Sequence, residues 1–253
     1  MRRIAPLLLV LAVGGCTLFR PARPGLPAGT TAEALLADLD ARRSLVHSVR
    51  ARVKFRSGLA QVWARQAVLV QRPSGVRIDV LSPFGLALAL GTDGETLWVY
   101  PPQDRLRYEG AATPENLSRF FGAPVRLDDL IDVLLGFPPH REPTAPPRLM
   151  PLAGGGGRVV IRFETGEQRL DFTGTPLRVQ RADELRDGRL ALRIDFGAYE
   201  DGFPREIDVS APDGSAARVR YVSVEPNVAI DEAVFRAPAA TRVLPIEAIQ
   251  VRR

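Results

Sequence analysis

The stretch LSPFGLALAL, residues 81–90, decides the fold because it joins a turn signal to a strand signal. Pro83 and Gly85 enclose Phe84, and this arrangement predicts a turn at which the backbone bends outward. The residues after the turn are apolar or small, which is typical of a buried strand. We therefore expect a strand over residues 86–90, either buried against helices or lining a cavity, with Phe84 presented outward.

Strand patterns continue on both sides of this turn. In residues 75–80, GVRIDV, valine and isoleucine alternate with arginine and aspartate, the pattern of a half-buried strand. The segment GTDG at 91–94 predicts a hairpin turn. Similar segments separated by Gly, Pro or Asp occur over residues 51–111 and again from 157 onward, and they predict about eleven or twelve strands.

Three segments have the spacing of helices. Thr30 or Thr31 caps a predicted helix over residues 32–49, where leucine and valine recur at helical intervals. Residues 113–122 begin with a threonine cap and a proline and end in glycine, and residues 127–135 carry leucines on one face before a glycine. Strands interrupted by short helices predict a mainly β (α+β) fold, a curved antiparallel sheet with helices on its concave side.

The rest of the chain fits one domain, residues 31–253. Residues 137–157 are rich in proline, close with four glycines and predict a loop. In the C-terminal tail we expect an apolar side chain such as Phe235 to pack against the body. No linker divides the alternating pattern, which favours a single folded unit.

The N-terminus has the order of a secretory signal. Two arginines precede the apolar run Ile4–Val13, and small residues follow it. The run is too short to span a bilayer, which needs about 20 residues. We expect residues 1–15 to be the signal and residues 16–30, rich in proline and glycine, to be a flexible tether.

Cys16 is the only cysteine of the chain, so no intramolecular disulfide can form. The segment Val13–Cys16, VGGC, resembles the lipobox of bacterial lipoproteins. That resemblance implies that Cys16 is acylated after cleavage of the signal. Thr17 stands where inner-membrane lipoproteins of enterobacteria tend to carry aspartate, so the resemblance favours the outer membrane. The alternative is an ordinary secretory signal with a chance cysteine.

The charge pattern excludes a typical nucleic-acid-binding protein. The net charge of +5 comes almost wholly from arginine, since Lys54 is the only lysine, and the basic residues are scattered through the strands. A nucleic-acid interface would show a basic stripe with interleaved aromatic residues. Attraction to an anionic membrane surface stays open.

Enzyme motifs are missing from the sequence. His47 and His140 have no metal-ligand spacing, and the Gly154–Gly157 run precedes a strand and lacks the Gly-Lys-Ser/Thr of a phosphate loop. We expect no enzyme activity, no cofactor and no metal. The carboxylates are interpreted as structural: Asp128, Asp129 and Asp132 as solvated charges of the helix over 127–135, and the pairs Asp183-Glu184 and Glu200-Asp201 as turn residues.

Residues 61–138 resemble the LolB family of outer-membrane lipoprotein receptors, and more loosely the superfamily of LolA, LolB and the periplasmic sensor RseB. The features come in order: a strand with WAR, a strand ending in LSPFG, the apolar LALAL with a hairpin, and LSRFFGAPVRLDDLIDVLLGFP at 117–138, which is similar to the family's paired short helices. The chain departs from the family in its Pro/Gly-rich segment after residue 137 and its abundance of arginine.

The resemblance implies an unclosed antiparallel barrel of about eleven strands, with helices covering an apolar cavity. Such a cavity would hold acyl chains of lipoproteins or lipids delivered by a periplasmic LolA-like carrier to a lipid-anchored monomer. The turn Pro83-Phe84-Gly85 matches the family's Pro-Leu-Gly, so Phe84 would enter the membrane. The candidate lining residues, which could equally be plain core, are Val68, Val70, Ile78, Val80, Leu88, Leu90, Leu97 and Leu134.

Two further functions stay open. A lipid-sensing or envelope-assembly scaffold lipoprotein would keep this fold and bind lipid without transferring it. An envelope hydrolase is the third reading, and no motif in the sequence supports it.

Overall fold

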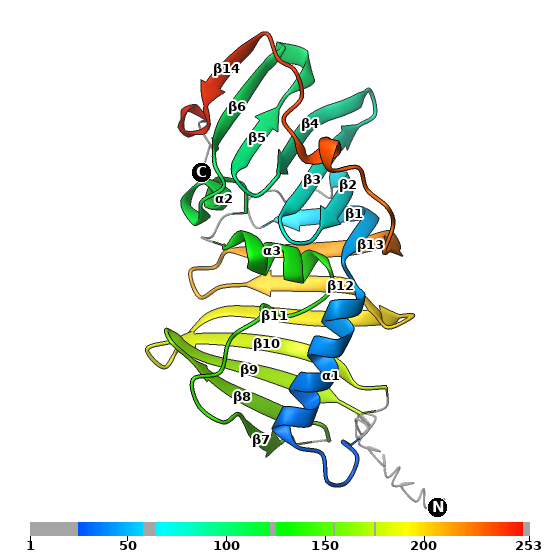
Figure 1. Ribbon diagram of the computed structural model, residues 1–253, viewed down its shortest axis with the longest axis vertical. Coiled ribbons are helices and arrows are strands. Elements are labelled where there is room, and N and C mark those ends of the chain that lie inside the picture. Colours follow the sequence, from blue (N-terminus) through cyan, green and yellow to red (C-terminus); the bar gives the residue numbers. More distant parts are fainter. Residues whose placement is uncertain (1–24, 58–63, 122–124, 154, 175, 250–253) are drawn as a thin grey trace, which may run out of the picture.

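The computed structural model of the protein describes residues 25–249, except for 58–63, 122–124, 154 and 175 (Figure 1). Fourteen strands within this part form one sheet. They are β1 (Ser48–Ser57), β2 (Ala64–Gln71), β3 (Gly75–Ser82), β4 (Gly85–Thr92), β5 (Thr96–Tyr100), β6 (Leu106–Ala111), β7 (Arg148–Pro151), β8 (Gly157–Phe163), β9 (Gly166–Thr173), β10 (Arg178–Arg186), β11 (Arg189–Glu200), β12 (Phe203–Ser210), β13 (Ala216–Pro226) and β14 (Arg242–Pro245).

The sheet has two free edges and does not close into a barrel. Its order is β14-β6-β5-β4-β3-β2-β1-β13-β12-β11-β10-β9-β8-β7, and the edge strands β14 and β7 lie at opposite ends of an elongated molecule (Figure 1). The expectation of a mainly β, unclosed sheet with helices is confirmed. Two details differ: fourteen strands are described rather than eleven or twelve, and β14 pairs with β6 in parallel rather than antiparallel.

One face of the sheet is apolar because side chains alternate along each strand and paired residues of neighbouring strands share a face. A fully buried side chain of this kind contributes about 1.5–3 kcal/mol. Across β1 to β5 the row is Ala51, Val68, Ile78, Leu90 and Val99, each paired in register with the next. Across β8 to β11 the corresponding row is Val159, Leu170, Ala182 and Ile194.

Two helices cover this apolar face. Figure 1 shows α1 (Ala32–Leu45) and α3 (Leu127–Leu134) on the same side of the sheet, and α2 (Pro114–Phe121) lies beside the strands of the C-terminal edge. The expected positions of α2 and α3 are confirmed. The buried residues of α1 and α3 belong to the same core cluster as the strand rows: Ala32, Leu35, Leu39, Leu130, Ile131, Leu134 and Leu135.

The first helix is shorter than expected. Thr31 caps it, since its hydroxyl accepts a hydrogen bond from Ala34 N at 3.2 Å, but the helix ends at Leu45 instead of continuing to Val49. Val46 is already extended, and Val49 lies fully buried in β1 between Val70 and Pro226 of the neighbouring strands. β-Branched residues favour such pairing, so the strand overrides the helical spacing.

Two further segments depart from simple loops. Residues 137–157, expected to be a loop, contain the edge strand β7, which pairs with β8. The C-terminal tail forms the short 3-10 helix η2 (Glu232–Phe235), where Phe235 is buried as expected and its carbonyl accepts a hydrogen bond from Trp98 Nε1 at 2.7 Å. Two other 3-10 helices are η1 (Pro102–Asp104) and η3 (Ile246–Ala248).

The described chain begins beside the far edge of the sheet. Leu26 packs against Gly157 of β8, so close that an added Cβ there would lie 2.5 Å from Leu26 Cδ1. Cys16, Thr17 and the predicted signal 1–15 lie outside the described residues. Among the helices that are described, none combines the length and the apolarity needed to cross a bilayer.

Candidate functional site: an exposed hairpin tip and a clamped helical face

The turn between β3 and β4 presents an apolar tip to solvent. Ser82 Oγ accepts a hydrogen bond from Phe84 N at 3.2 Å and donates one to Gly85 O at 3.0 Å, which closes the turn. Gly85 has φ +113°, a conformation that only glycine adopts without strain. The Phe84 side chain is 98% exposed and Leu81, at the end of β3, is 44% exposed. An apolar surface is thus held outward by local backbone geometry.

The predicted lining residues lie together in the core. Six of them are buried, with at most 8% of each exposed: Val68, Val70, Ile78, Leu90, Leu97 and Leu134. Val80 and Leu88, which pair with each other nearest the tip, are only partly buried. Leu134 reaches this cluster from α3, and its carbonyl accepts a hydrogen bond from Tyr221 OH at 2.9 Å. Their role in holding an acyl chain stays a prediction.

A hollow of about 310 Å³ opens on the other face of the sheet. Its walls are mostly charged, and its carboxylates are matched by arginines of neighbouring strands. Arg158 Nε lies 2.6 Å from Asp171, and Arg181 Nε lies 2.7 Å from Asp195. Such a hollow does not suit an acyl chain. The lining residues are Asp171, Gln180, Arg181, Asp195, Phe196, Gly197, Glu206 and Asp208.

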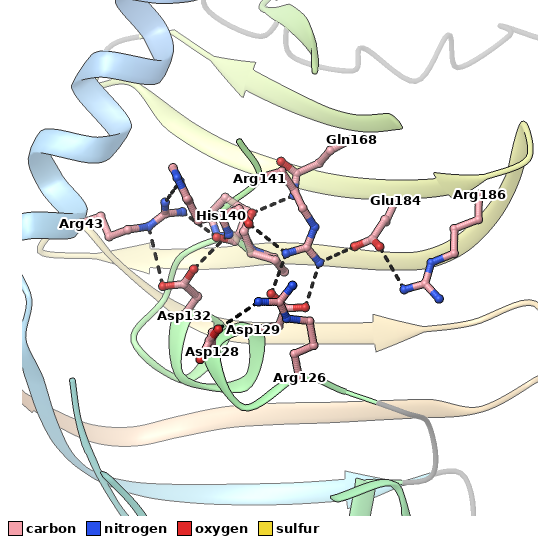
Figure 2. Close-up of polar contacts among 12 residues, drawn as sticks. Arg43, Arg126, Asp128, Asp129, Asp132, His140, Arg141, Gln168, Glu184 and Arg186 are labelled. Atoms are coloured by element: carbon pink, nitrogen blue, oxygen red, sulfur yellow. Dashed lines mark hydrogen bonds and ion pairs between the residues drawn. The ribbon is translucent and has the colours of Figure 1, made fainter. Parts of the chain in front are cut away.

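Figure 2 shows Asp132 of α3 beside Arg43 of α1, and Asp132 also binds Arg72, the residue that follows β2. Its carboxylate is almost fully buried and accepts hydrogen bonds from Arg72 Nη2 at 2.6 Å and from His140 N at 3.0 Å. Arg43 Nε of α1 lies 3.7 Å away. Burial lowers the pKa of Arg43, and the charges of Asp132 and Asp40 oppose that effect. The interpretation of Asp132 as a solvated helix charge is therefore wrong.

Arg141 forms the second half of this clamp. Its guanidinium donates to both carboxylate oxygens of Asp129, at 2.6 and 2.8 Å, and to Glu184 Oε2 at 2.8 Å (Figure 2). It also lies over the ring of Phe163, 5.5 Å from the centroid. Burial disfavours the charged form, but the hydrogen bonds and charges of Asp129 and Glu184 outweigh it and raise the pKa of Arg141. We call the pairs of Asp132 and Arg141 together the helix clamp.

The clamp overturns two more interpretations. Asp129 is largely buried rather than solvated. Asp183 and Glu184 do not occupy a turn: they lie inside β10, both 6% exposed, and Asp183 is bonded to Arg193 of β11 at 2.7 Å. Asp128 is a solvated helix charge as expected, and the pair Glu200-Asp201 does lie at the β11–β12 turn.

The histidines take structural positions. His140 Nδ1 lies 2.7 Å from Arg43 Nη1, and its Nε2 lies 3.0 Å from Glu142 Oε1. The backbone N of His47 donates to Asn227 Oδ1 at 3.1 Å. Within the described residues, no group of three or more His, Cys, Asp or Glu side chains has the arrangement of a metal site.

Three solved structures share this architecture. A LolA superfamily protein from Nitrosomonas europaea is 15% identical with a TM-score of 0.54, and the match covers 82% of this chain and 98% of the other. A domain described as an outer-membrane lipoprotein-sorting protein from Vibrio parahaemolyticus is 15% identical with a TM-score of 0.52, covering 81% and 95%. A DUF1329 family protein from Desulfovibrio piger is 14% identical with a TM-score of 0.52, and the match covers 81% of this chain and 95% of the other.

At this level of identity the likeness concerns the fold alone, which the chain shares with these proteins. No model of a known protein family matches the sequence, and no curated protein matches it. The predicted unclosed sheet with covering helices is thereby supported by independent structures, while the family resemblance of residues 61–138 extends only as far as the fold.

Proposed function

We propose that the protein is a lipid-anchored envelope protein that binds acyl chains and helps to insert lipoproteins into the outer membrane, as the LolB family does. In this proposal Cys16 carries the anchor, Thr17 permits outer-membrane sorting, and a periplasmic LolA-like carrier delivers the cargo. The exposed Phe84 carries the proposal, because a closed, glycine-dependent turn holds this side chain in solvent next to the exposed Leu81. The shared fold of a LolA superfamily protein supports it.

Such a protein would bind its cargo by burying acyl chains and would catalyse no reaction. Each methylene of an acyl chain that leaves water contributes about 0.8 kcal/mol. The apolar residues of the core between the sheet and α3, such as Val68 and Ile78, would supply the contact surface. Helices cover these residues in this conformation, so an acyl chain can enter only if α1 or α3 moves. No bond is made or broken, and neither a cofactor nor a metal is needed.

The tip would act at the last step. A phenylalanine that passes from water into the membrane gains about 1.5–3 kcal/mol, and aromatic side chains suit the lipid–water interface. Val80 and Leu88 continue the apolar surface from the tip toward the buried core. An acyl chain that leaves the core would therefore stay in contact with apolar side chains on its way to the membrane.

Delivery of a fluorescent triacylated lipopeptide from the protein to vesicles tests the proposal. We expect protein beginning at Thr17 to bind the lipopeptide, and mass spectrometry to find acyl chains in a detergent-free preparation. Phe84→Glu should leave binding unchanged but slow delivery by about tenfold to a hundredfold, which corresponds to the lost burial of one phenylalanine. Phe84→Leu should keep delivery.

Met150→Glu is the matched control, since Met150 is also exposed, at 52%, but lies on the edge strand β7, far from the turn. Equal slowing by Met150→Glu and Phe84→Glu would reduce the tip to a general surface effect. Failure of the wild-type protein to bind the lipopeptide, with no acyl chains in the extract, would remove the proposed function altogether.

A lipid-sensing or assembly-scaffold lipoprotein is the second candidate, and the helix clamp is the observation that favours it. Buried ion pairs tie α1 and α3 to the sheet, which suits a protein that holds one conformation until a signal releases it. Such a sensor would bind the lipopeptide without delivering it, and would change its affinity for a protein partner instead.

A further inference from the structure

Four basic side chains lie together on the uncovered face of β1 and β2. Arg52, Lys54 and Arg56 occupy alternate positions of β1, and Arg65 lies on β2; all four are exposed. We call them the basic patch. Every second residue of a strand points to the same side. These basic side chains therefore extend from the face of the sheet opposite to the buried Val49, Ala51 and Val53.

The basic patch places like charges opposite each other. Lys54 pairs in register with Arg65 on one side and with Arg220 on the other, and Arg56 pairs with Arg218. Like charges that are directly opposite destabilise a sheet. The pairing of Lys54 with Arg65 therefore lowers the stability of the isolated protein.

The two arginines of β13 that lie opposite the basic patch are paired with carboxylates of β12. Arg220 lies 3.0 Å from Glu206, and Arg218 is paired with Asp208. Within the described residues, neither Lys54 nor Arg65 has a carboxylate within 4.0 Å. These two cations thus face solvent with no counterion in the described part of the chain, and they can meet an anion from outside.

The patch borders the apolar tip. Arg65 pairs in register with Leu81, the exposed penultimate residue of β3, and Phe84 follows three residues later in the turn. Figure 1 shows β1, β2 and β3 side by side. Cations beside exposed apolar side chains are the arrangement of proteins that dock on anionic membranes, where the apolar group enters and the charges stay among the headgroups.

We propose that the basic patch binds anionic phospholipid headgroups and so orients the hairpin tip toward the bilayer. The inference rests on the part of the proposed function in which Phe84 reaches a membrane, but it does not require a bound acyl chain. Near an anionic surface each Lys or Arg strengthens binding by about fivefold. The effect depends on salt, because the screening length falls from about 8 Å at 0.15 M to about 3 Å at 1 M.

Sedimentation with vesicles tests the inference, using protein from Thr17 onward, which keeps every described element. We expect binding to vesicles of phosphatidylcholine and phosphatidylglycerol, weaker binding to phosphatidylcholine alone, and loss of the difference at high salt. The double variant Lys54→Gln/Arg65→Gln should bind the anionic vesicles about 25-fold less. Its melting temperature should not fall, because the substitutions relieve a like-charge contact.

The matched control is Arg148→Gln/Arg189→Gln, which removes the same charge from exposed positions of β7 and β11. It should change binding by less than about twofold, since these residues lie far from the tip. Equal losses in the two double variants would overturn the inference, as would no loss in either. Absence of vesicle binding under every condition would also overturn it and would point to an acidic protein as the partner.

Phe84→Ser separates this inference from the proposed function. If it weakens binding while Lys54→Gln/Arg65→Gln does not, the tip survives and the basic patch has no membrane role. If only the charge variant weakens binding, the patch survives and the inserting tip is wrong.

Discussion

Replacing Asp132 by alanine should destabilise the protein far more than an ordinary substitution on a short helix. The carboxylate is 4% exposed and faces Arg72 Nη2 at 2.6 Å and Arg43 Nε at 3.7 Å. Arg43 Nε is itself buried without a hydrogen-bond partner and faces Asp132, while Nη1 of the same guanidinium is paired with Asp40 at 3.2 Å. Removing one partner from a buried ion pair costs about 3–5 kcal/mol, and the contact of Arg43 with Asp40, which stays, places the expected loss at the lower end.

This loss would be a large part of a stability that is typically about 5–15 kcal/mol. We expect Asp132→Ala to lower the urea midpoint, followed by far-ultraviolet circular dichroism, with the slope of the transition unchanged. Asp132→Asn keeps the shape and can still accept a hydrogen bond, so it should lose less. Combining Asp132→Ala with Arg72→Ala should lose less than the two single effects added together, since both remove the same contact.

Asp128→Ala is the control within the same helix. Asp128 is paired with Arg126, but both side chains are mostly exposed, at 73% and 66%, so the variant should change stability by at most about 0.5 kcal/mol. If Asp132→Ala and Asp128→Ala are equally mild, the clamp contributes nothing to stability and our account of it is wrong.

Two further predictions concern a buried phenol and the anchor. Burial raises the pKa of Tyr221 above its ordinary value of 10.0, so its stabilising contribution is complete below about pH 10 and is lost as the pH rises toward the folded-state value. Tyr221→Phe should cost about 1 kcal/mol at neutral pH through the lost bond to Leu134 O, and this deficit should shrink above pH 10 in urea titrations; a constant gap would contradict it. Cys16→Ser should give a soluble periplasmic protein without the mass of acyl chains, and unchanged membrane fractionation would count against lipidation.

The sequence predicted correctly those elements that begin and end at capping, proline or glycine residues. The cap, proline and glycine around residues 113–122 predict α2, and the Pro83-Phe84-Gly85 turn predicts an exposed tip; the structure has both. The helix over 32–49 was predicted too long because spacing alone does not reveal that Val49 gains a strand partner on each side.

The helix clamp was missed because its partners are distant in the sequence. A carboxylate near a helix N-terminus already has a local explanation, so nothing near Asp132 signals that Arg43 and Arg72 will meet it. The pair Asp183-Glu184 was assigned to a turn, whereas the structure extends β10 through both residues and pairs Glu184 with Arg141. The abundance of arginine was the available signal, since so many guanidiniums need carboxylates.

The place where the chain enters the fold limits how the protein can stand on a membrane. Leu26 rests on β8, and eight strand spacings, about 38 Å along the sheet, separate β8 from β3 and its tip. The ten residues from Cys16 to Leu26 can extend to about 35 Å at most. If Cys16 is anchored, a fully upright molecule with Phe84 on the same bilayer would overstretch this tether by about 3 Å. The molecule must therefore tilt toward the surface, and a slack tether requires a larger tilt.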